Sequence, residues 1–291
     1  MNKVLIVVLI FFGGVVAALL VLSYFAYVID SGPPDEIVVN ALEGPSQVLF
    51  AEQGTATVTA TNLDDAMAGL GYAQVASRTW PLLLYRAAAT GRFAALAGPA
   101  GVAVDEMVYR LGIGESAEAA YTGLDTRERR LLDAFASGIN AGLTEAPITR
   151  DPSLVLSGHL PEPWLPWHTL AVERLFGWLA VRTRSVEDFP DPIRTALGLH
   201  DFGESTIVSS EWPSEPGLFV RYVWGSSALP VLFETSVDGA GSEPVRGACL
   251  IGTPFFVAAR NGDRAWSFLL DQDAVVHTVL TDSVELQRQS E

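Results

Sequence analysis

The chain of 291 residues begins with an apolar segment, Val4 to Ile29, that contains no charged side chain. As an α-helix its 26 residues would rise about 39 Å, more than the ~30 Å hydrocarbon core of a bilayer. The apolar region of a cleaved signal peptide is usually only about 7–15 residues long and is followed by a small-x-small cleavage site. Because no convincing site of that kind precedes Asp30, the sequence predicts an uncleaved transmembrane anchor, residues 1–29.

The charges that flank this segment predict its orientation. Lys3 lies before it, and acidic residues begin at Asp30 directly after it. Because positive charge favours the cytoplasmic side, we expect a single-pass protein of the bacterial inner (cytoplasmic) membrane. Its N-terminus would be cytoplasmic and its main domain periplasmic or otherwise extracytoplasmic.

The overall charge excludes one class of function. The chain has 18 Lys and Arg against 34 Asp and Glu, which gives a net charge of −16. Such a surface repels phosphates, so we expect no nucleic-acid partner. The single cysteine, Cys249, lies in an apolar run and permits no intramolecular disulfide. A lone cysteine in such a run is typical of a small core residue.

Asp64 to Gly98 forms one long, interrupted helical pattern. Thr61 or Asn62 can cap its start, and apolar residues recur at helical spacing. Pro81 should bend or break the helix. Gly69 and Gly71 allow a neighbouring segment to approach closely. A second helical pattern, from Thr126 to Leu143, has one apolar face, and Thr126 can cap it.

Several short motifs follow one another along residues 64–184. The first helix contains an acidic-Ala pair, a Gly-Leu-Gly-Tyr block, an Arg-x-Trp element and an Arg-x-x-x-x-Gly-Arg tail. An Ala-x-Gly-Ile-Asn-Ala element and a Pro-Glu-Pro-Trp-x-Pro block come later. In this order they resemble the signature of the penicillin acylase family. The residues are Asp65-Ala66, Gly69–Tyr72, Arg78, Trp80, Arg86, Gly91-Arg92, Gly98, Asp105, Arg110–Gly112, Ala136–Ala141 and Pro161–Trp167.

The resemblance implies an α+β fold: a truncated N-terminal-nucleophile-hydrolase-like domain behind the single transmembrane helix. We expect a linker over 30–47, a helical α-chain-like region over 48–202, and a truncated β-chain-like region of short antiparallel strands over 203–291. The resemblance returns at Gly247–Pro254, Arg260-Asn261 and Ala265-Trp266. Strand patterns cover 48–60, 218–224, 229–237, 245–251 and 255–260.

Family members cut their own precursor before a Ser in a Gly-Ser-Asn-x-Trp motif, and the freed α-amino group becomes the general base. The matching stretch here is Gly203-Glu204-Ser205-Thr206-Ile207-Val208. Aligned without a gap, Glu204 occupies the nucleophile position, and a one-residue gap places Ser205 there. A carboxylate cannot carry out the N-to-O acyl shift. The Asn and Trp of the motif are absent, and the family's oxyanion-hole Asn would fall beyond Glu291.

The resemblance therefore predicts a pseudoenzyme with no catalytic residues and no cofactor. The family's structural calcium site suggests Glu187, Asp271 and Asp273 as candidate ligands. Calcium takes six to eight oxygen ligands, so solvent-facing acids are the favoured interpretation. His159, His168, His200 and His277 show no metal-ligand spacing.

The sequence hypothesis is a non-catalytic, membrane-anchored, penicillin-acylase-like scaffold that acts as a structural subunit of a larger membrane protein complex. It would contact this complex through both the transmembrane helix and the extracytoplasmic domain. A respiratory or photosynthetic assembly fits, although no residue selects between them. Two alternatives stay open: an amidohydrolase that uses Ser205, and a module that binds an acyl ligand without cutting it.

Overall fold

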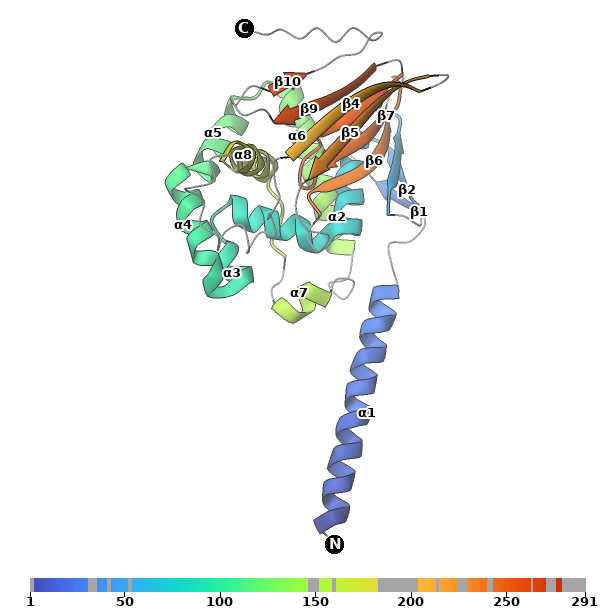
Figure 1. Ribbon diagram of the computed structural model, residues 1–291, viewed down its shortest axis with the longest axis vertical. Coiled ribbons are helices and arrows are strands. Elements are labelled where there is room, and N and C mark those ends of the chain that lie inside the picture. Colours follow the sequence, from blue (N-terminus) through green and yellow to red (C-terminus); the bar gives the residue numbers. More distant parts are fainter. Residues whose placement is uncertain are drawn as a thin grey trace.

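The structure is a computed structural model, and it describes most of the chain in twelve stretches. An apolar helix, α1 (Lys3–Asp30), projects away from a mixed domain of helices and strands (Figure 1). Within α1, Ile6–Tyr24 is long and apolar enough to cross a membrane, and none of this span is buried against the domain. The described residues are 3–30, 36–40, 43–51, 54–145, 152–158, 161–182, 204–212, 215–223, 230–239, 243–262, 264–270 and 276–278.

Eight strands form one sheet in the order β1-β2-β3-β6-β7-β8-β9-β10. Neighbouring strands are antiparallel, except that β3 and β6 run parallel to each other. Two further strands, β4 (Glu204–Trp212) and β5 (Glu215–Val223), pair as a separate antiparallel ribbon. The strands of the sheet are β1 (Glu36–Asn40), β2 (Pro45–Phe50), β3 (Ala56–Ala60), β6 (Leu232–Gly239), β7 (Val245–Leu250), β8 (Phe256–Asn261), β9 (Arg264–Leu270) and β10 (Val276–Thr278).

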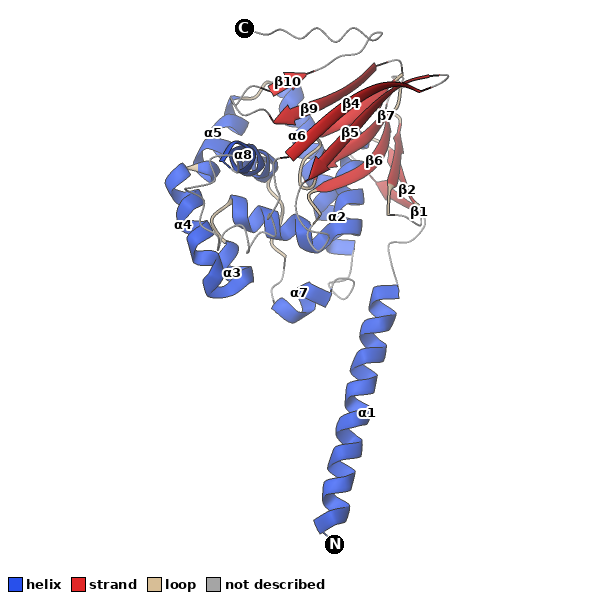
Figure 2. Cartoon of the chain, in the orientation of Figure 1, coloured by secondary structure: helices blue, strands red, loops and turns tan. Residues whose placement is uncertain are grey.

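The helices gather on one side of the sheet, so the domain has a helical layer and a strand layer (Figure 2). The long helix α2 lies between them and contacts both β2 and β3 on one side and α6 and α8 on the other. The helices are α2 (Leu63–Ala89), α3 (Phe93–Ala97), a 3₁₀ turn η1 (Gly98–Gly101), α4 (Val102–Leu111), α5 (Ile113–Gly123), α6 (Thr126–Glu145), α7 (Pro152–Ser157) and α8 (Pro166–Arg182).

Glycines let α2 touch α6 backbone to backbone. A Cβ atom at Gly71 would lie 2.2 Å from the Phe135 carbonyl oxygen, and one at Gly138 would lie 1.8 Å from the Ala68 carbonyl oxygen. Such distances are far below van der Waals contact, so no larger residue fits there. Gly69 faces the other way, and its Cβ would lie 2.2 Å from the Ser46 hydroxyl of β2. The close approach expected at Gly69 and Gly71 is confirmed, with a different partner for each.

The bend expected near Pro81 is present. Arg78 has φ −140° and ψ 42°, which is outside the helical region, and it divides α2 into two parts. Pro81 has no N–H to give to the Ser77 carbonyl one turn earlier. The guanidinium of Arg78 donates to that carbonyl instead, at 3.3 Å. The Thr79 hydroxyl likewise donates to the Val75 carbonyl, at 2.6 Å. Side chains thus replace backbone donors at the kink.

Some local expectations need correction. The helix α6 is capped by Asp125, not by Thr126: the Asp125 side chain accepts from the Glu128 N–H, and Glu128 accepts from the Asp125 N–H. This is a capping box, and Asp at its first position outcompetes the neighbouring Thr. The strand β1 falls inside the segment 30–47 interpreted as linker, and the strand pattern at 48–60 is a hairpin of two strands, β2 and β3. The strands β4, β9 and β10 lie inside the expected strand region 203–291, but no individual strand pattern was assigned to them.

The first prediction concerns the contact between α2 and α6. Gly138→Ala should lower the free energy of unfolding by several kcal/mol or prevent folding, because its Cβ would overlap the Ala68 carbonyl. Gly177→Ala is the matched control: it lies in α8, and within the described residues nothing is within 4 Å of its Cβ position. It should be neutral or stabilising by up to about 1 kcal/mol. Thermal unfolding in mild detergent measures both, and an equal effect of the two changes would contradict this packing.

Candidate functional site

The motifs that carry the family resemblance meet around α2, and an acidic residue fixes its first turn. Asp65 is fully buried, and its carboxylate accepts from the Glu43 N–H at 3.1 Å and from the Asn62 side-chain amide at 2.6 Å. Asn62 returns a capping bond to the Asp65 N–H at 2.8 Å, so Asn62 is the N-cap of α2. Asp65 thereby joins the start of the helix to the turn that leads into β2.

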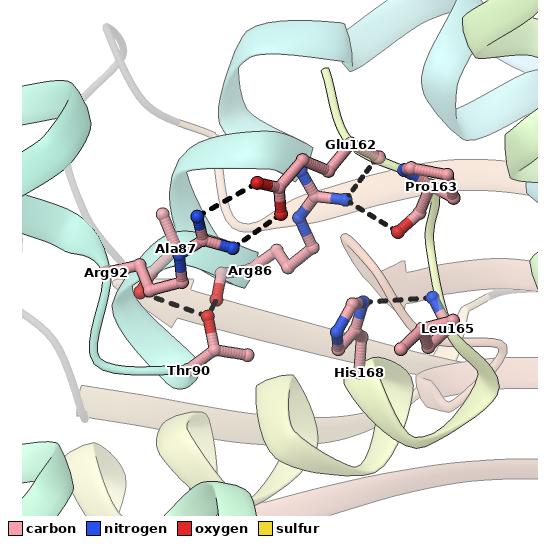
Figure 3. A network of polar contacts seen from close by, with 8 residues as sticks. All are labelled: Arg86, Ala87, Thr90, Arg92, Glu162, Pro163, Leu165 and His168. Atoms are coloured by element: carbon pink, nitrogen blue, oxygen red, sulfur yellow. Dashed lines mark hydrogen bonds and ion pairs between the residues drawn. The ribbon is translucent and has the colours of Figure 1, made fainter. Parts of the chain in front are cut away.

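A second cluster forms where α2 ends. Arg92 makes a two-pronged ion pair with the Glu162 carboxylate, at 2.5 and 2.9 Å (Figure 3). Arg86 donates to the Glu162 carbonyl at 2.7 Å and lies over the Trp164 ring. The two arginines therefore hold the loop that precedes α8. Both partners of the Arg92–Glu162 pair are more than half exposed, so the pair contributes little to stability by itself.

Asn140 on α6 fixes the same loop from the other side. Its side-chain amide donates to the Trp164 carbonyl at 2.9 Å, and its oxygen accepts from the Trp164 N–H at 2.7 Å. The Trp164 ring is buried, and its Nε1 donates to the Thr169 hydroxyl at 3.1 Å. Asn140 and Trp164 belong to two separate sequence motifs, and this pair of bonds explains why the motifs occur together.

His168 lies beside this cluster and is an unsuitable base. Its Nδ1 accepts from the Leu165 N–H at 3.0 Å, and its ring packs edge-on against Trp164 and Trp167. Burial, with the nearby Arg86 charge, lowers the pKa of His168 from 6.5 to about 4. The imidazole is therefore neutral at pH 7, and a neutral imidazole has one acceptor nitrogen, which the Leu165 N–H already occupies. We assign His168 a structural role.

A third cluster joins α2 to the sheet. Gln74 is fully buried, and its side chain donates to the Thr253 carbonyl and accepts from the Gly252 N–H, each at 2.8 Å. The same amide donates to the Cys249 sulfur at 3.3 Å. Burial raises the pKa of the Cys249 thiol to about 12, so it stays a thiol, as expected for a core cysteine. Gln74 completes the turn between β7 and β8.

The structure places the backbone of the two candidate nucleophiles at the start of β4. Glu204 is paired with Val223 and Ser205 with Tyr222 across the β4–β5 ribbon, and β4 also approaches β9. The peptide bond between Glu204 and Ser205 therefore lies inside a paired hairpin. Their side chains lie outside the described part of the chain, so their chemical role stays a prediction.

The calcium candidates Glu187, Asp271 and Asp273 lie outside the described residues. Within the described ranges, no group of three or more His, Cys, Asp or Glu side chains is placed to hold a metal ion.

Sequence reasoning missed Gln74 and the roles of Arg86, Arg92 and Glu162. The arginines and Glu162 were recognised only as motif positions, and nothing in their spacing told which backbone groups they bind. Asp105 is a similar case: its carboxylate accepts from the Phe93 and Ala94 N–H groups and so fixes the start of α3. A polar residue inside an otherwise apolar helical face is the one signal that was available for Gln74.

The fold and these clusters define a mixed helix-and-sheet domain whose motif residues bind one another across α2, α6, α8 and the sheet. A family model for penicillin amidase matches residues 45–214, which is more than half of the chain. The chain belongs to the penicillin amidase family.

Curated relatives match a similar part of the chain. Penicillin acylase 2 proenzyme from Pseudomonas sp. is 32% identical over 142 residues, which cover 48% of this chain and 18% of that protein. An acyl-homoserine lactone acylase QuiP from Pseudomonas putida is 29% identical over 140 residues, 47% of this chain and 17% of that protein. The chain thus spans less than a fifth of the length of the curated relatives it matches.

A solved structure, a thermostable penicillin G acylase from Alcaligenes faecalis in a tetragonal form, is 19% identical. The match covers 61% of this chain and 99% of that chain, with a TM-score of 0.41.

The second prediction compares the buried and exposed polar contacts. Gln74→Met keeps the side-chain volume but leaves the Gly252 N–H and the Thr253 carbonyl unpaired in the core. It should cost roughly 2–4 kcal/mol of unfolding free energy. Glu162→Gln removes one partner of an exposed pair and should cost less than about 1 kcal/mol. Denaturant or thermal unfolding measures both. Similar losses of unfolding free energy in the two variants would show that the buried hydrogen bonds of Gln74 do not stabilise the fold more than the exposed ion pair does.

The third prediction concerns pH. The folded pKa of His168 is about 4 and its ordinary value is 6.5. Between these values the unfolded chain binds a proton that the folded chain does not. The free energy of unfolding therefore falls as pH falls from about 6.5 to about 4, by at most about 3 kcal/mol and less where water screens the ring. His168→Asn keeps an acceptor near the Nδ1 position, and its stability should lose this part of the pH dependence. Parallel melting curves at pH 7 and pH 4.5 would contradict the assignment if the two proteins lost stability equally.

Proposed function

We propose that this protein is a membrane-anchored member of the penicillin amidase family that does not hydrolyse amides. It serves instead as a structural subunit of a larger membrane complex, on the extracytoplasmic side. The observation that carries the proposal is the sequence Gly203–Val208, which lacks the Ser-Asn-x-Trp part of the family's processing motif. Without self-cleavage no α-amino group becomes free to act as the general base.

The polar clusters support the same proposal. Asp65, Gln74 and Asn140 direct their side chains to backbone groups of this chain. Cys249 is an inert thiol and the acceptor nitrogen of His168 is occupied. Among the described residues, the motif side chains serve to hold the fold, and none of these groups has the protonation state or the access of a nucleophile or base.

The helix α1 supports the anchored location. Large apolar side chains along Ile6–Tyr24 are exposed in the structure, and nothing in the domain covers them. Exposed apolar area of this extent is unfavourable in water by about 25 cal/mol per Å². A bilayer removes that cost, and helices of neighbouring membrane subunits would remove it equally well.

The fourth prediction tests the proposal by intact mass. The full chain is purified from membranes in mild detergent, and its denaturing mass spectrum is recorded. We expect one unprocessed chain that co-purifies with other membrane proteins. The variant Ser205→Ala should also give one unprocessed chain, with a mass that differs only by the substituted side chain. Ser209→Ala, on the same strand β4, is the matched control.

Two fragments divided between residues 203 and 205 would contradict the proposal, provided that Ser205→Ala abolishes the cleavage and Ser209→Ala does not. Hydrolysis of acyl-amides or acyl-homoserine lactones that depends on Ser205 would overturn it as well. If the chain instead migrates alone as a monomer in mild detergent, the proposal that it is a structural subunit of a complex is wrong.

A further inference from the structure

One corner of the domain is free of charge over twelve consecutive residues. Phe93 to Val104, which spans α3, η1 and the first turn of α4, contains only Phe, Ala, Leu, Gly, Pro and Val. We call the exposed side chains of this segment the apolar corner: Ala95, Ala97, Pro99, Ala100, Val102 and Ala103.

The apolar corner contrasts with the rest of the molecule. The chain carries a net charge of −16, and the charged residues that flank this segment are Arg92 and Asp105. Asp105 is turned inward, because its carboxylate accepts from the Phe93 and Ala94 N–H groups. Arg92 is paired with Glu162. The corner therefore presents small apolar groups to its surroundings without a competing free acidic group of its own.

The apolar corner lies at the end of the domain toward which α1 projects. In Figure 1, α3 and α7 form that end: α7 lies level with the last turns of α1, and α3 reaches the level at which α1 ends. The helix α7 approaches α1 and also contains no charged residue. Two uncharged elements and the apolar helix thus share one end of the molecule.

The end of α1, and with it the apolar corner, lies at the height of a bilayer surface. The uncharged part of α1, Val4–Ile29, is about 39 Å long, which exceeds the hydrocarbon core, and it ends at the charged Asp30. A bilayer has a hydrocarbon core of about 30 Å and a total thickness of about 40–45 Å, so the last turns of α1 lie in the headgroup layer. Elements at the same height along α1 lie there too.

We propose that the apolar corner rests in the headgroup layer of the membrane that α1 crosses, so that this end of the domain lies on the lipid surface. The proposal rests on the membrane anchoring proposed above. Acidic side chains are repelled by anionic headgroups, so the surface of this acidic domain that touches lipid should carry no free acidic group. Small apolar groups give weak affinity, but α1 already holds the corner beside the bilayer, and a tethered contact needs little further affinity.

The test labels an introduced cysteine, which is possible because the single native cysteine is unreactive. Cys249 is fully buried with its pKa raised to about 12, so it does not react with a maleimide dye in the folded protein. A cysteine is introduced at Ala100, labelled with a small environment-sensitive dye, and the full chain is placed in phosphatidylcholine nanodiscs. Brominated acyl chains then quench dyes at membrane depth. The controls are Val15→Cys, inside α1, and Glu118→Cys, exposed on α5 at the far end of the domain.

We expect brominated lipid to cause a clear loss of emission at positions 100 and 15 and no loss at position 118. Quenching at position 15 alone would overturn the lipid contact while leaving the anchor intact. No quenching at position 15 would overturn the anchor, and the lipid contact with it.

A second variant tests whether quenching at position 100 arises from the protein surface or from binding of the dye itself to lipid. Val102→Asp places a charge in the apolar corner, and Val102 is 47% exposed, so the fold should tolerate it. It should abolish quenching at position 100 and leave position 15 unchanged. Tyr109→Asp, two turns further along α4 and 82% exposed, is the matched control and should change neither signal. Quenching at position 100 that survives Val102→Asp would contradict the proposal.

Discussion

The structure depends on the way α2 is enclosed. On one side Gly71 and Gly138 bring its backbone against that of α6, and on the other Gly69 lets β2 approach. A helix with neighbours this close cannot rotate or shift along its axis without overlap, because interiors are packed at crystal-like density. The position of α2 therefore sets the position of both layers, and the kink at Arg78 sets where its second half, with Arg86, points.

The sheet and Gln74 extend this constraint to the second half of the chain. The strand β3 pairs in parallel with β6, so segments about 180 residues apart share one sheet. Gln74 reaches from α2 to the turn at Gly252 and Thr253, and both the nitrogen and the oxygen of its side-chain amide form hydrogen bonds there. A buried amide in a fully satisfied network specifies one arrangement, since any other would leave polar groups unpaired. The helical and strand regions expected from the sequence are thus parts of one folded body.

Part of this fold could be predicted from the sequence and part could not, for physical reasons. Local signals worked where one strong determinant acts within a few residues: the Asn62 cap, the Pro81 bend and the glycine contacts of α2. They failed where two local signals compete, as with Asp125 and Thr126, and where a short strand lies at the edge of the sheet. The five-residue strand β1 is such a case: among the described residues it pairs only with β2, through backbone hydrogen bonds that no side-chain pattern reveals.

The candidate site divides in the same way. The motifs identified the family, because their order is preserved, but they did not reveal what each side chain binds. The structure shows that Asp65, Asn140, Arg86 and Gln74 bind backbone groups of distant segments. Side chains with this role are needed for folding whether or not the protein catalyses a reaction, so a chain can keep them after its nucleophile changes. Family membership therefore follows from residues that build the domain, whereas the proposed loss of activity concerns a separate and smaller set, the positions Glu204 and Ser205. Because the two sets of residues are separate, a chain can keep the fold of this family while its activity is lost.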